Sequence, residues 1–452
     1  MPNYDLIIRG GTVVTPERVE RADIGVAEGR IAALEPELAG EARESVDAVG
    51  LHIFPGLIDA HVHFNEPGRT EWEGWASGSA ALAAGGGTTC FEMPLNAHPP
   101  TLDGPSFDAK RAAAEAASVV DFALWGGLTP LNLDRLDELA ARGVVGFKAF
   151  MSQSGIDDFP AADDLTLYEG MVRAARLGRI VAVHAESDQL TSALARRAVA
   201  EGRVTARDYA RSRPALAEAE AIQRAILLAE EAGCALHIVH VSTGRGVRLV
   251  AEARARGADV SCETCPHYLA LTEDDLEALG AVAKCAPPLR PADEVAALWQ
   301  HLLGGDLAIV ASDHSPAPPD MKTGDDFFRI WGGISGCQST LQVLLEEGHA
   351  RRGLPLETIA GVTAWNVARR FGLAPAKGRI AVGADADLAL VDLGHSAALR
   401  ADELLYRHRQ SPYVGRTLRG RVVRTLVRGT TIARDGKIVI DHPIGRLVTP
   451  TS

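Results

Sequence analysis

The sequence predicts an α/β protein: a distorted (β/α)8 barrel of the TIM type with a small β-sandwich built from both chain ends. Eight short apolar segments alternate with stretches of helical periodicity in the middle of the chain, which is the pattern of repeated βα units. Both ends instead alternate apolar and polar positions between turn signals. The length of 452 residues leaves room for one large barrel and a smaller unit.

The two chain ends have the pattern of short hairpin strands. This pattern covers 4–14 and 21–36 near the start and 385–393 and 424–440 near the end. We therefore expect both ends to form one small β unit with little helix. The predicted division is a composite β-sandwich domain, 1–54 plus 378–452, and a catalytic barrel, 55–377.

The middle of the chain supplies the predicted barrel strands. They are the segments 57–63, 88–94, 121–127, 144–150, 179–186, 235–242, 258–264 and 307–314. Amphipathic helices are expected between several of them, with Gly143 and Gly233 as C-terminal caps of two. In such a barrel the active site lies at the C-terminal ends of the strands.

Composition and charge exclude several classes of function. The chain has 59 acidic and 46 basic side chains, so it lacks the positive field that binds a phosphate backbone. No apolar run approaches the roughly 20 residues of a membrane span, and the start does not have the pattern of a secretion signal. Six cysteines in this context are expected to be reduced thiols. We expect a cytoplasmic protein with a small-molecule substrate, without nucleic acid or membrane as partners.

The side chains best suited to bind metal lie near the C-terminal ends of the predicted strands. They are His61, His63, Lys148, His184, His240 and Asp313. Because these strand ends meet at one mouth, we expect the six side chains to face one another. The i, i+2 spacing of His61 and His63 puts both imidazoles on one face of a strand. That spacing alone also fits a buried structural pair, and the partners on other strands favour metal binding.

This set of ligands exceeds the three that one catalytic zinc ion takes, and it predicts two divalent metal ions per subunit: zinc, with cobalt or manganese as alternatives. Two close cations repel and need an anionic bridge. A neutral Lys148 amine can capture carbon dioxide and become N6-carboxylysine, which would bind both ions; the alternative is an ordinary strand-end lysine. A bridging hydroxide would be the nucleophile. Asp313 would be the catalytic residue that contacts one ion and takes the proton.

At these residues the sequence resembles the cyclic amidohydrolases, the hydantoinase, dihydroorotase and allantoinase group of the amidohydrolase superfamily. The resemblance covers nearly the whole chain, with motifs at 55–63, 146–150, 183–186, 240–242, 263–269, 286–290 and 312–315. It implies a metal-bearing barrel and a homotetramer that hydrolyses a cyclic amide or ureide. It also implies that His61, His63 and Asp313 hold one ion, that His184 and His240 hold the other, and that carboxylated Lys148 bridges them.

Within this group, the segments 63–74, 93–101, 148–155 and 331–336 resemble allantoinases, which implies hydrolysis of allantoin to allantoate in purine and ureide degradation. Dihydroorotases carry an arginine where this chain has Asn65, and hydantoinases carry a tyrosine where it has Gln153. Ala149, Gln153 and Ala286 depart from the allantoinase pattern. Activity of the hydantoinase, dihydropyrimidinase or dihydroorotase type is the alternative, and a catalytically inactive scaffold is an alternative outside the hydrolases.

The candidates for substrate contact are Asn96, Ser152, Cys285, Ala286 and Ile334. Main-chain groups near the last three and the amide of Asn96 would meet the substrate. A hydroxyl of Ser152 or Ser154, or a metal ion, would polarise the carbonyl in place of the tyrosine. Asn96 and Arg69 fit either a substrate contact or a role in ordering their loop. His267 is expected to be a structural histidine with satisfied hydrogen bonds.

Overall fold

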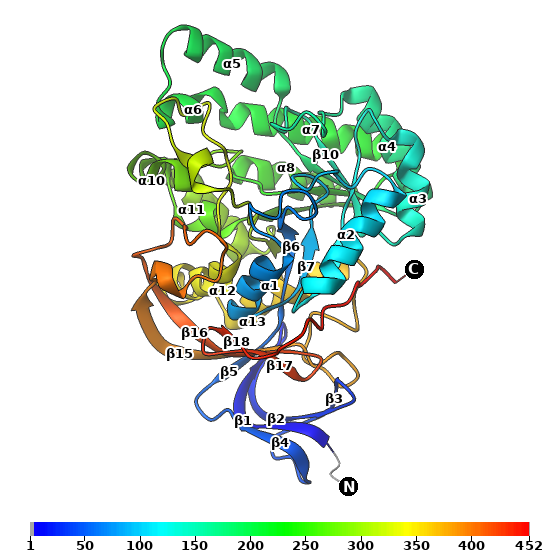
Figure 1. The fold of residues 1–452 in the computed structure, drawn as a ribbon, viewed down its shortest axis with the longest axis vertical. Helices are drawn as coiled ribbons and strands as arrows, with labels where there is room; N and C mark the ends of the chain where they lie inside the picture. The colour runs from blue at the N-terminus through cyan, green and yellow to red at the C-terminus, as the bar shows by residue number, and fades with distance from the viewer. Residues whose placement is uncertain (1–3, 452) are drawn as a thin grey trace.

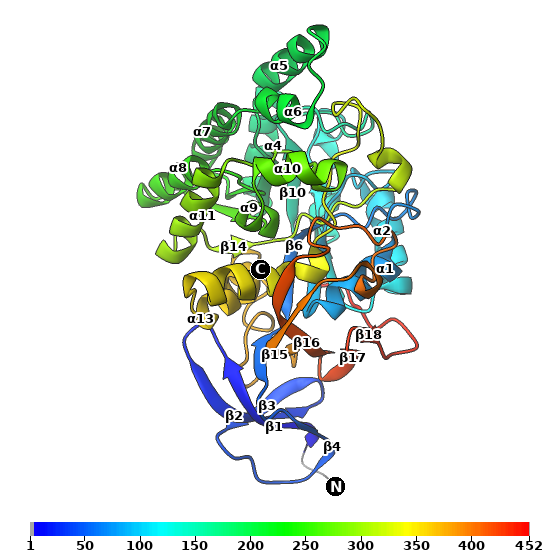
Figure 2. The same cartoon turned by 90° about the vertical axis from the view of Figure 1, so that its left-hand side faces the viewer.

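The structure of the protein is a computed structural model that describes residues 4–451. Figures 1 and 2 show two parts stacked along the long axis: a barrel surrounded by helices and, at the lower end, a β-sheet to which both chain ends contribute. The sheet topology confirms the predicted α/β architecture.

One nine-stranded sheet joins the two ends of the described chain. Its strands are β1 (Tyr4–Val14), β2 (Val19–Ala27), β3 (Arg30–Glu35), β4 (Ala42–Asp47), β5 (His52–Pro55), β15 (Leu388–Ala398), β16 (Thr417–Val427), β17 (Thr430–Arg434) and β18 (Lys437–Ile438). The two ends meet at β5, which pairs in parallel with β1 and antiparallel with β15. Ile24, Ile53 and Leu388 are buried in the separate apolar core of this part.

Nine parallel strands, which correspond to the eight predicted segments, form the barrel. The strands are β6 (Leu57–Val62), β7 (Gly87–Glu92), β8 (Asp121–Leu124), β9 (Gly126–Gly127), β10 (Gly146–Phe150), β11 (Ile180–His184), β12 (Leu236–Ile238), β13 (Val260–Thr264) and β14 (Ile309–Val310). A single residue, Trp125, separates β8 from β9, so every predicted segment contains an observed strand. Val62 on β6 bridges His314 just after β14 in parallel, which brings the first and last strands together.

Helices cover the outside of the barrel. They are α1 (Trp75–Ala84), α2 (Gly104–Ala117), α3 (Leu136–Ala141), α4 (Asp164–Arg176), α5 (Asp188–Ala200), α6 (Ala206–Ser212), α7 (Ala215–Ala232), α8 (Gly244–Ala255), α9 (Pro266–Ala270), α10 (Glu273–Leu279), α11 (Ala292–Gly304), α12 (Thr340–Val343), α13 (Leu356–Ala360) and α14 (Asn366–Arg370). Asp103 and Asp163 cap the starts of α2 and α4 by accepting main-chain N–H groups. Gly233 ends α7 with a φ of 62°, as predicted.

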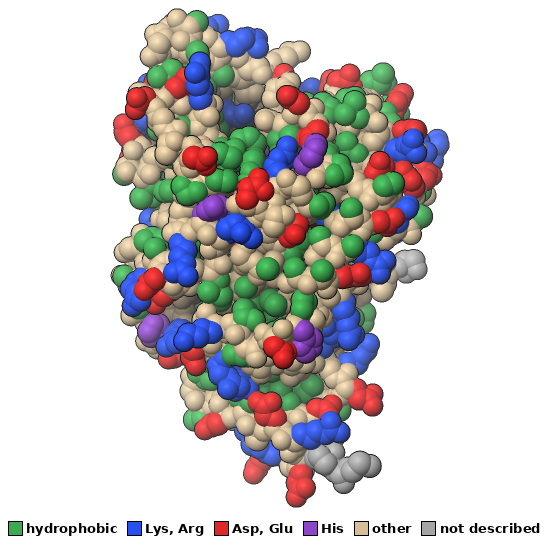
Figure 3. All heavy atoms as spheres, in the orientation of Figure 1, with side chains coloured by type: hydrophobic (Ala, Val, Ile, Leu, Met, Phe, Trp, Pro, Cys, Tyr) green, Lys and Arg blue, Asp and Glu red, His purple; other side chains and the backbone are tan. Residues whose placement is uncertain are grey.

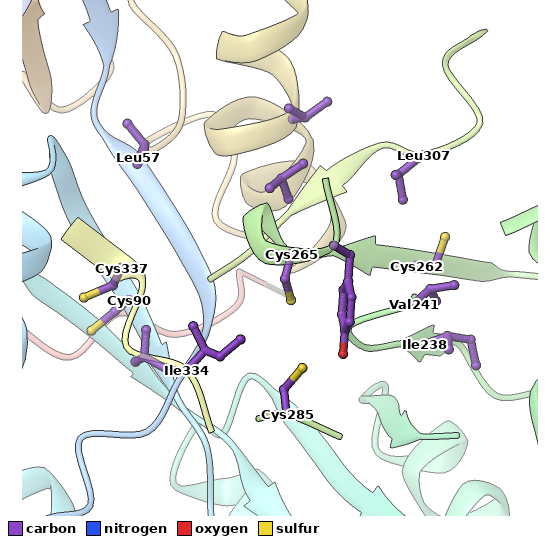
Figure 4. Packing of buried hydrophobic residues seen from close by; sticks show 14 of the residues in the cluster. Leu57, Cys90, Ile238, Val241, Cys262, Cys265, Cys285, Leu307, Ile334 and Cys337 are labelled. Atoms are coloured by element: carbon purple, nitrogen blue, oxygen red, sulfur yellow. The ribbon is translucent and has the colours of Figure 1, made fainter. Parts of the chain in front are cut away.

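The cysteines pack as small apolar groups. All six are buried, and none forms a disulfide. Figure 4 shows Cys90 and Cys337 next to each other, with Cys265 and Cys285 elsewhere in the same apolar cluster. Burial raises the pKa of Cys262 and Cys285 to about 12, so both are uncharged thiols at neutral pH.

The chain leaves the terminal sheet after β18 and returns to the barrel. The main-chain N–H of Phe122 donates to the oxygen of Arg446 at 2.9 Å, and that of Val448 donates to the oxygen of Phe122 at 2.7 Å. This end, which the predicted division assigns to the small domain, therefore also pairs with β8 of the barrel.

Charged side chains of both signs are mixed on the surface. On the face shown in Figure 3, basic and acidic side chains are interspersed. Among residues 4–451, none of the helices combines the length and apolar character needed to span a bilayer.

Candidate active site

All six candidate metal ligands lie at the C-terminal end of the barrel. His61, Lys148 and His184 are on β6, β10 and β11, whereas His63, His240 and Asp313 closely follow β6, β12 and β14. His240 and Asp313 have positive φ angles of 40° and 46°. Such a backbone is unfavourable for residues other than glycine, and it is concentrated at functional sites, where the surrounding packing holds it.

The first ligand cluster consists of His61, His63 and Asp313. The Nε2 atoms of His61 and His63 lie 3.2 and 3.5 Å from Oδ1 of Asp313. All three side chains are buried, and their ligand atoms lie within 4.8 Å of one another. This set of two imidazoles and one carboxylate is typical of a catalytic zinc ion.

The second ligand cluster is a pair of histidines. Nδ1 of His184 lies 3.0 Å from Nε2 of His240. The rings of His240 and His61 are 5.4 Å apart, so the pair adjoins the first cluster. Burial lowers the pKa of both His184 and His240, which keeps these imidazoles neutral and able to bind a cation.

Lys148 is wholly buried beside both clusters. Its ammonium donates to the main-chain oxygen of Ala149 at 3.2 Å and lies 3.6 Å from the centre of the Phe150 ring. Burial lowers the pKa of Lys148 to about 7, although the carboxylates of Asp313 and Glu263 oppose that shift. A large fraction of the amine is therefore neutral at neutral pH, which is the form that reacts with carbon dioxide.

These residues fit a pair of divalent cations. Imidazole nitrogens lie 3.0 Å from each other in one cluster and 3.2 to 3.5 Å from a carboxylate oxygen in the other, spacings that suit donor atoms around shared ions. A charged Lys148 would oppose both ions, since its charge already lowers the pKa of His63 and His184, after the larger effect of burial. A carbamate at this position would replace that positive charge by a negative one.

Asp313 has the charge that a proton acceptor needs. Burial alone would raise its pKa, but the imidazoles of His61, His63 and His240 hold that pKa well below its usual range. Asp313 also lines the cavity described below. An ionised carboxylate therefore faces the space in which a substrate would lie.

Glu263 orients His61 and was not among the predicted residues. Its Oε1 accepts from Nδ1 of His61 at 2.7 Å, and its Oε2 accepts from Nε2 of His237 at 3.1 Å. Burial would raise the pKa of Glu263, but these two imidazoles hold it at about 2. The carboxylate fixes the ring so that Nε2 of His61 points at Asp313. The signal in the sequence was its position at the start of the 263–269 motif.

Glu186 has the same role for His184. Its Oε2 accepts from Nε2 of His184 at 2.8 Å and is also ion-paired with Arg213. Burial would raise the pKa of Glu186, but Arg213 and His184 hold it at about 2. Nδ1 of His184 is thereby directed at His240. The signal was the i, i+2 spacing from His184.

A cavity of about 400 Å³ opens over the ligands. Among its lining residues are His61, His63, His184, His240, Asp313, Asn96, Cys285 and Ala286. Two of the predicted substrate contacts do not line it. Ser152 is buried, and its hydroxyl has no hydrogen-bond partner among residues 4–451, whereas the main-chain oxygen of Ile334 accepts from the N–H of Ser315 at 2.9 Å.

Sequence reasoning missed other residues of the cavity wall: Tyr209, Arg213, Lys284 and the residues 328–333. The hydroxyl of Tyr209 donates to the main-chain oxygen of Cys285 at 3.0 Å. These residues lie on α6 and on loops, outside the strand ends where ligands were sought. Their side chains carry no spacing pattern that would have marked them.

Two residues at the first loop have structural contacts. Asn65 does not line the cavity, and its side-chain amide lies 3.5 Å from the main-chain oxygen of Pro316. Arg69 donates to the main-chain oxygen of Asn96 at 2.8 Å. Of the two readings left open for Arg69, the structure therefore favours ordering of the loop that carries Asn96.

His267 differs from its prediction. It is buried, and within residues 4–451 neither ring nitrogen has a hydrogen-bond partner, so the expectation of a satisfied structural histidine was wrong. Its ligand atom lies within 4.8 Å of those of Cys265 and Asp313. Burial lowers the pKa of His267 to about 4, which makes the ring neutral at neutral pH.

Comparison with known proteins decides the family. The sequence model of the Amidohydrolase family matches residues 52–439. The chain belongs to this family. It is 64% identical to an allantoinase of Rubrobacter xylanophilus over 450 residues, which covers 100% of this chain and 98% of the relative. It is 45% identical to an allantoinase of Escherichia coli, with 97% and 99% coverage.

Solved structures with the same fold include members of the hydantoinase branch. The L-hydantoinase (dihydropyrimidinase) from Arthrobacter aurescens superposes with a TM-score of 0.96 at 36% identity, covering 99% of this amidohydrolase and 100% of that chain. The dihydropyrimidinase from Brevibacillus agri gives a TM-score of 0.92 at 32% identity, with 98% coverage of both chains.

Proposed function

We propose that this amidohydrolase is a binuclear allantoinase, which opens the five-membered ring of allantoin to give allantoate in purine and ureide degradation. The observation that carries the proposal is the convergence of five candidate ligands, His61, His63, His184, His240 and Asp313, on one cavity, with Lys148 buried beside them. The 64% identity to an allantoinase, over nearly the full length of both chains, supports the choice of substrate.

Each ligand residue has a defined part in this proposal. His61, His63 and Asp313 would hold one ion, His184 and His240 the other, and Lys148 would bridge them as N6-carboxylysine. Two divalent cations, zinc or alternatively cobalt or manganese, supply polarisation of the ring carbonyl and a water-derived nucleophile at neutral pH. Asp313 accepts the proton of the attacking water, and Glu263 and Glu186 keep their histidines oriented.

The charges of the cavity wall favour a neutral substrate. Arg213 is ion-paired with Glu186, and the ammonium of Lys284 donates to main-chain oxygens of Phe327 and Ile330. Neither of these two cations is free to meet a carboxylate. The third cation of the lining, Arg329, is 89% exposed and lies 3.4 Å from Asp326, so it stays in solvent. A carboxylate on the substrate would be desolvated without a partner, at a cost of several kcal/mol. Allantoin is neutral, so its amide groups can be satisfied by main-chain groups near Cys285 and Ala286 and by Asn96.

We expect purified enzyme with added zinc, cobalt or manganese to hydrolyse allantoin at least about a hundredfold better, in kcat/KM, than dihydroorotate. The measurement is a turnover panel of allantoin, hydantoin, dihydrouracil and dihydroorotate. Hydantoin is the matched comparison because it has the same ring without the ureido arm. Equal turnover of dihydroorotate would contradict the neutral-substrate argument, and a preference for hydantoin or dihydrouracil would favour the hydantoinase alternative.

The orienting role of Glu263 gives a second prediction. Glu263→Gln should weaken metal binding about 10- to 100-fold. The neutral amide cannot supply the negative charge with which the Glu263 carboxylate orients His61 and His237. Competition with a chelator measures this affinity. Glu218→Gln is the matched control, since this buried glutamate accepts from Ser242 and Thr243 and contacts none of the ligands. Equal loss in both variants would show that Glu263 has no specific role.

We also propose that the enzyme acts in the cytoplasm as a homotetramer. The buried, unpaired cysteines support a reducing compartment, and the family resemblance supports the assembly. Light scattering at several protein concentrations gives the mass of the assembly directly, and a single-chain mass would contradict the tetramer.

A further inference from the structure

The segment 316–335 covers part of the cavity with very little regular structure. It leads from β14 toward α12, and within it the structure describes a short 3-10 turn, Pro319–Lys322, and a single parallel bridge from Ile334 to His314. Its residues 328–333 line the cavity wall. Trp331 also packs edge-to-face on Trp72, with ring centres 4.9 Å apart. Something other than secondary structure must therefore hold this wall in place.

Lys284, which lies outside the segment 316–335, holds it by hydrogen bonds. It stands directly before Cys285, and its ammonium donates to the main-chain oxygens of Phe327, at 2.6 Å, and Ile330. Its own main-chain oxygen accepts from the N–H of Gly333 at 2.7 Å. One lysine thus joins the segment to residues 285 and 286 at three points.

Lys322 belongs to the segment itself and connects two parts of it. Its ammonium donates to the main-chain oxygen of Gly333 at 2.6 Å and lies 3.4 Å from that of Ala281. On its other side Gly333 packs so closely on Ser315 that a Cβ atom would lie 2.1 Å from the main-chain oxygen of Ser315, and the N–H of Ser315 donates to the main-chain oxygen of Ile334 at 2.9 Å. Residues at the end of the segment are therefore held next to Ser315, which lies two positions after Asp313.

Both ammonium groups are stabilised in an unusual way. Lys284 and Lys322 are only 4% and 9% exposed, and no carboxylate of residues 4–451 lies within 4 Å of either nitrogen. Main-chain oxygens, and for Lys284 the face of the Tyr209 ring at 4.5 Å, are what compensates the buried charge. Burial lowers the pKa of Lys284 to about 7 and that of Lys322 to about 8. An apolar side chain in either place would leave buried main-chain oxygens without a donor, so each lysine is needed to satisfy the segment that it contacts.

We propose that Lys284 and Lys322 are positioning residues, which fix the segment 316–335 over the cavity and thereby determine how well a cyclic ureide is bound. The inference about substrate rests on the proposed allantoinase function; the inference about the segment does not. Neither lysine belongs to the proposed metal ligands. Their removal is expected to disturb the wall that recognises the ring while leaving the hydrolytic centre intact.

Limited proteolysis tests the hold on the segment without any substrate. The side chain of Arg329 is 89% exposed, so trypsin cleaves after it whenever the segment opens. We expect cleavage at this bond to become at least about tenfold faster in Lys284→Met and in Lys322→Met, because each change leaves main-chain oxygens without their donor. Lys110→Met is the control: it removes another wholly buried lysine, whose ammonium donates to the main-chain oxygen of Met93 and lies 3.7 Å from Oε1 of Glu92, with no contact to the segment 316–335.

Kinetics and metal content test the role toward substrate. For allantoin we expect KM to rise about tenfold in both variants, with a smaller fall in kcat. The metal content should equal that of the unchanged enzyme. Melting temperatures of the variants and the unchanged enzyme show whether general destabilisation contributes. Lys284→Arg keeps a cationic donor and should recover part of the KM effect.

The outcomes separate the two proposals. Unchanged cleavage after Arg329 in both variants, or an equal acceleration in Lys110→Met, would overturn the positioning role. Faster cleavage with an unchanged KM would overturn the role in substrate binding. Failure of the unchanged enzyme to hydrolyse allantoin would contradict the proposed function, while the proteolysis result would still stand.

Discussion

Replacement of Lys148 by alanine is expected to remove most of the bound metal and to lower allantoin hydrolysis by at least about a hundredfold, the upper range found for residues that merely support a metal ligand. The reason is that the variant loses the anionic bridge between two mutually repelling cations. Short carboxylic acids with bicarbonate should restore part of both properties, because a small anion can occupy the space that the side chain leaves.

Metal analysis and turnover, measured on the same preparations, check this expectation. Lys322→Ala is the matched control, since it also truncates a buried lysine but should keep its metal. Full activity in Lys148→Ala would remove the binuclear centre from consideration. Loss of metal in both variants would point to general destabilisation instead.

Asp313→Asn is expected to keep much of its metal and to lose turnover by about 10²- to 10⁴-fold, the range for loss of a general base. The amide still offers an oxygen to a cation, but it cannot accept a proton. Because the histidines hold the pKa of Asp313 far below neutrality, the loss should persist across the whole pH range in which the enzyme is folded. A loss below about tenfold would mean that another group takes the proton.

Much of the fold could be predicted because each barrel strand carries its own signal. The apolar segments, such as 57–63 and 179–186, are short, end at turn signals and are followed by helical periodicity. The number and order of the barrel strands could therefore be predicted. The pairing of residues 446–448 with β8 was not predictable, because it is made by main-chain groups of Phe122 and by the Asp121 carboxylate, which accepts the N–H of Arg446, and none of these contacts leaves a periodic pattern in the sequence. The interruption of the third strand at Trp125 is likewise a property of packing.

The candidate site also has a part that the sequence predicts and a part that it does not. The metal-binding side chains stand at strand ends, where topology alone brings them together, and the structure places all six at the same end of the barrel. The cavity wall formed by Tyr209, Arg213 and Lys284 comes from loops and a short helix, whose approach depends on tertiary contacts. His267 shows the remaining difficulty, since hydrogen bonding of a buried ring cannot be judged from its neighbours in sequence.

Native mass spectrometry of enzyme purified without chelator and supplied with zinc and bicarbonate tests the central claim most directly. Active protein is predicted to carry two zinc ions and the mass of one added carbon dioxide per chain, and Lys148→Ala is predicted to lack the carbon dioxide and most of the zinc. Full activity on allantoin with one ion or none per chain, and without the added carbon dioxide, would contradict the carbamate-bridged binuclear centre.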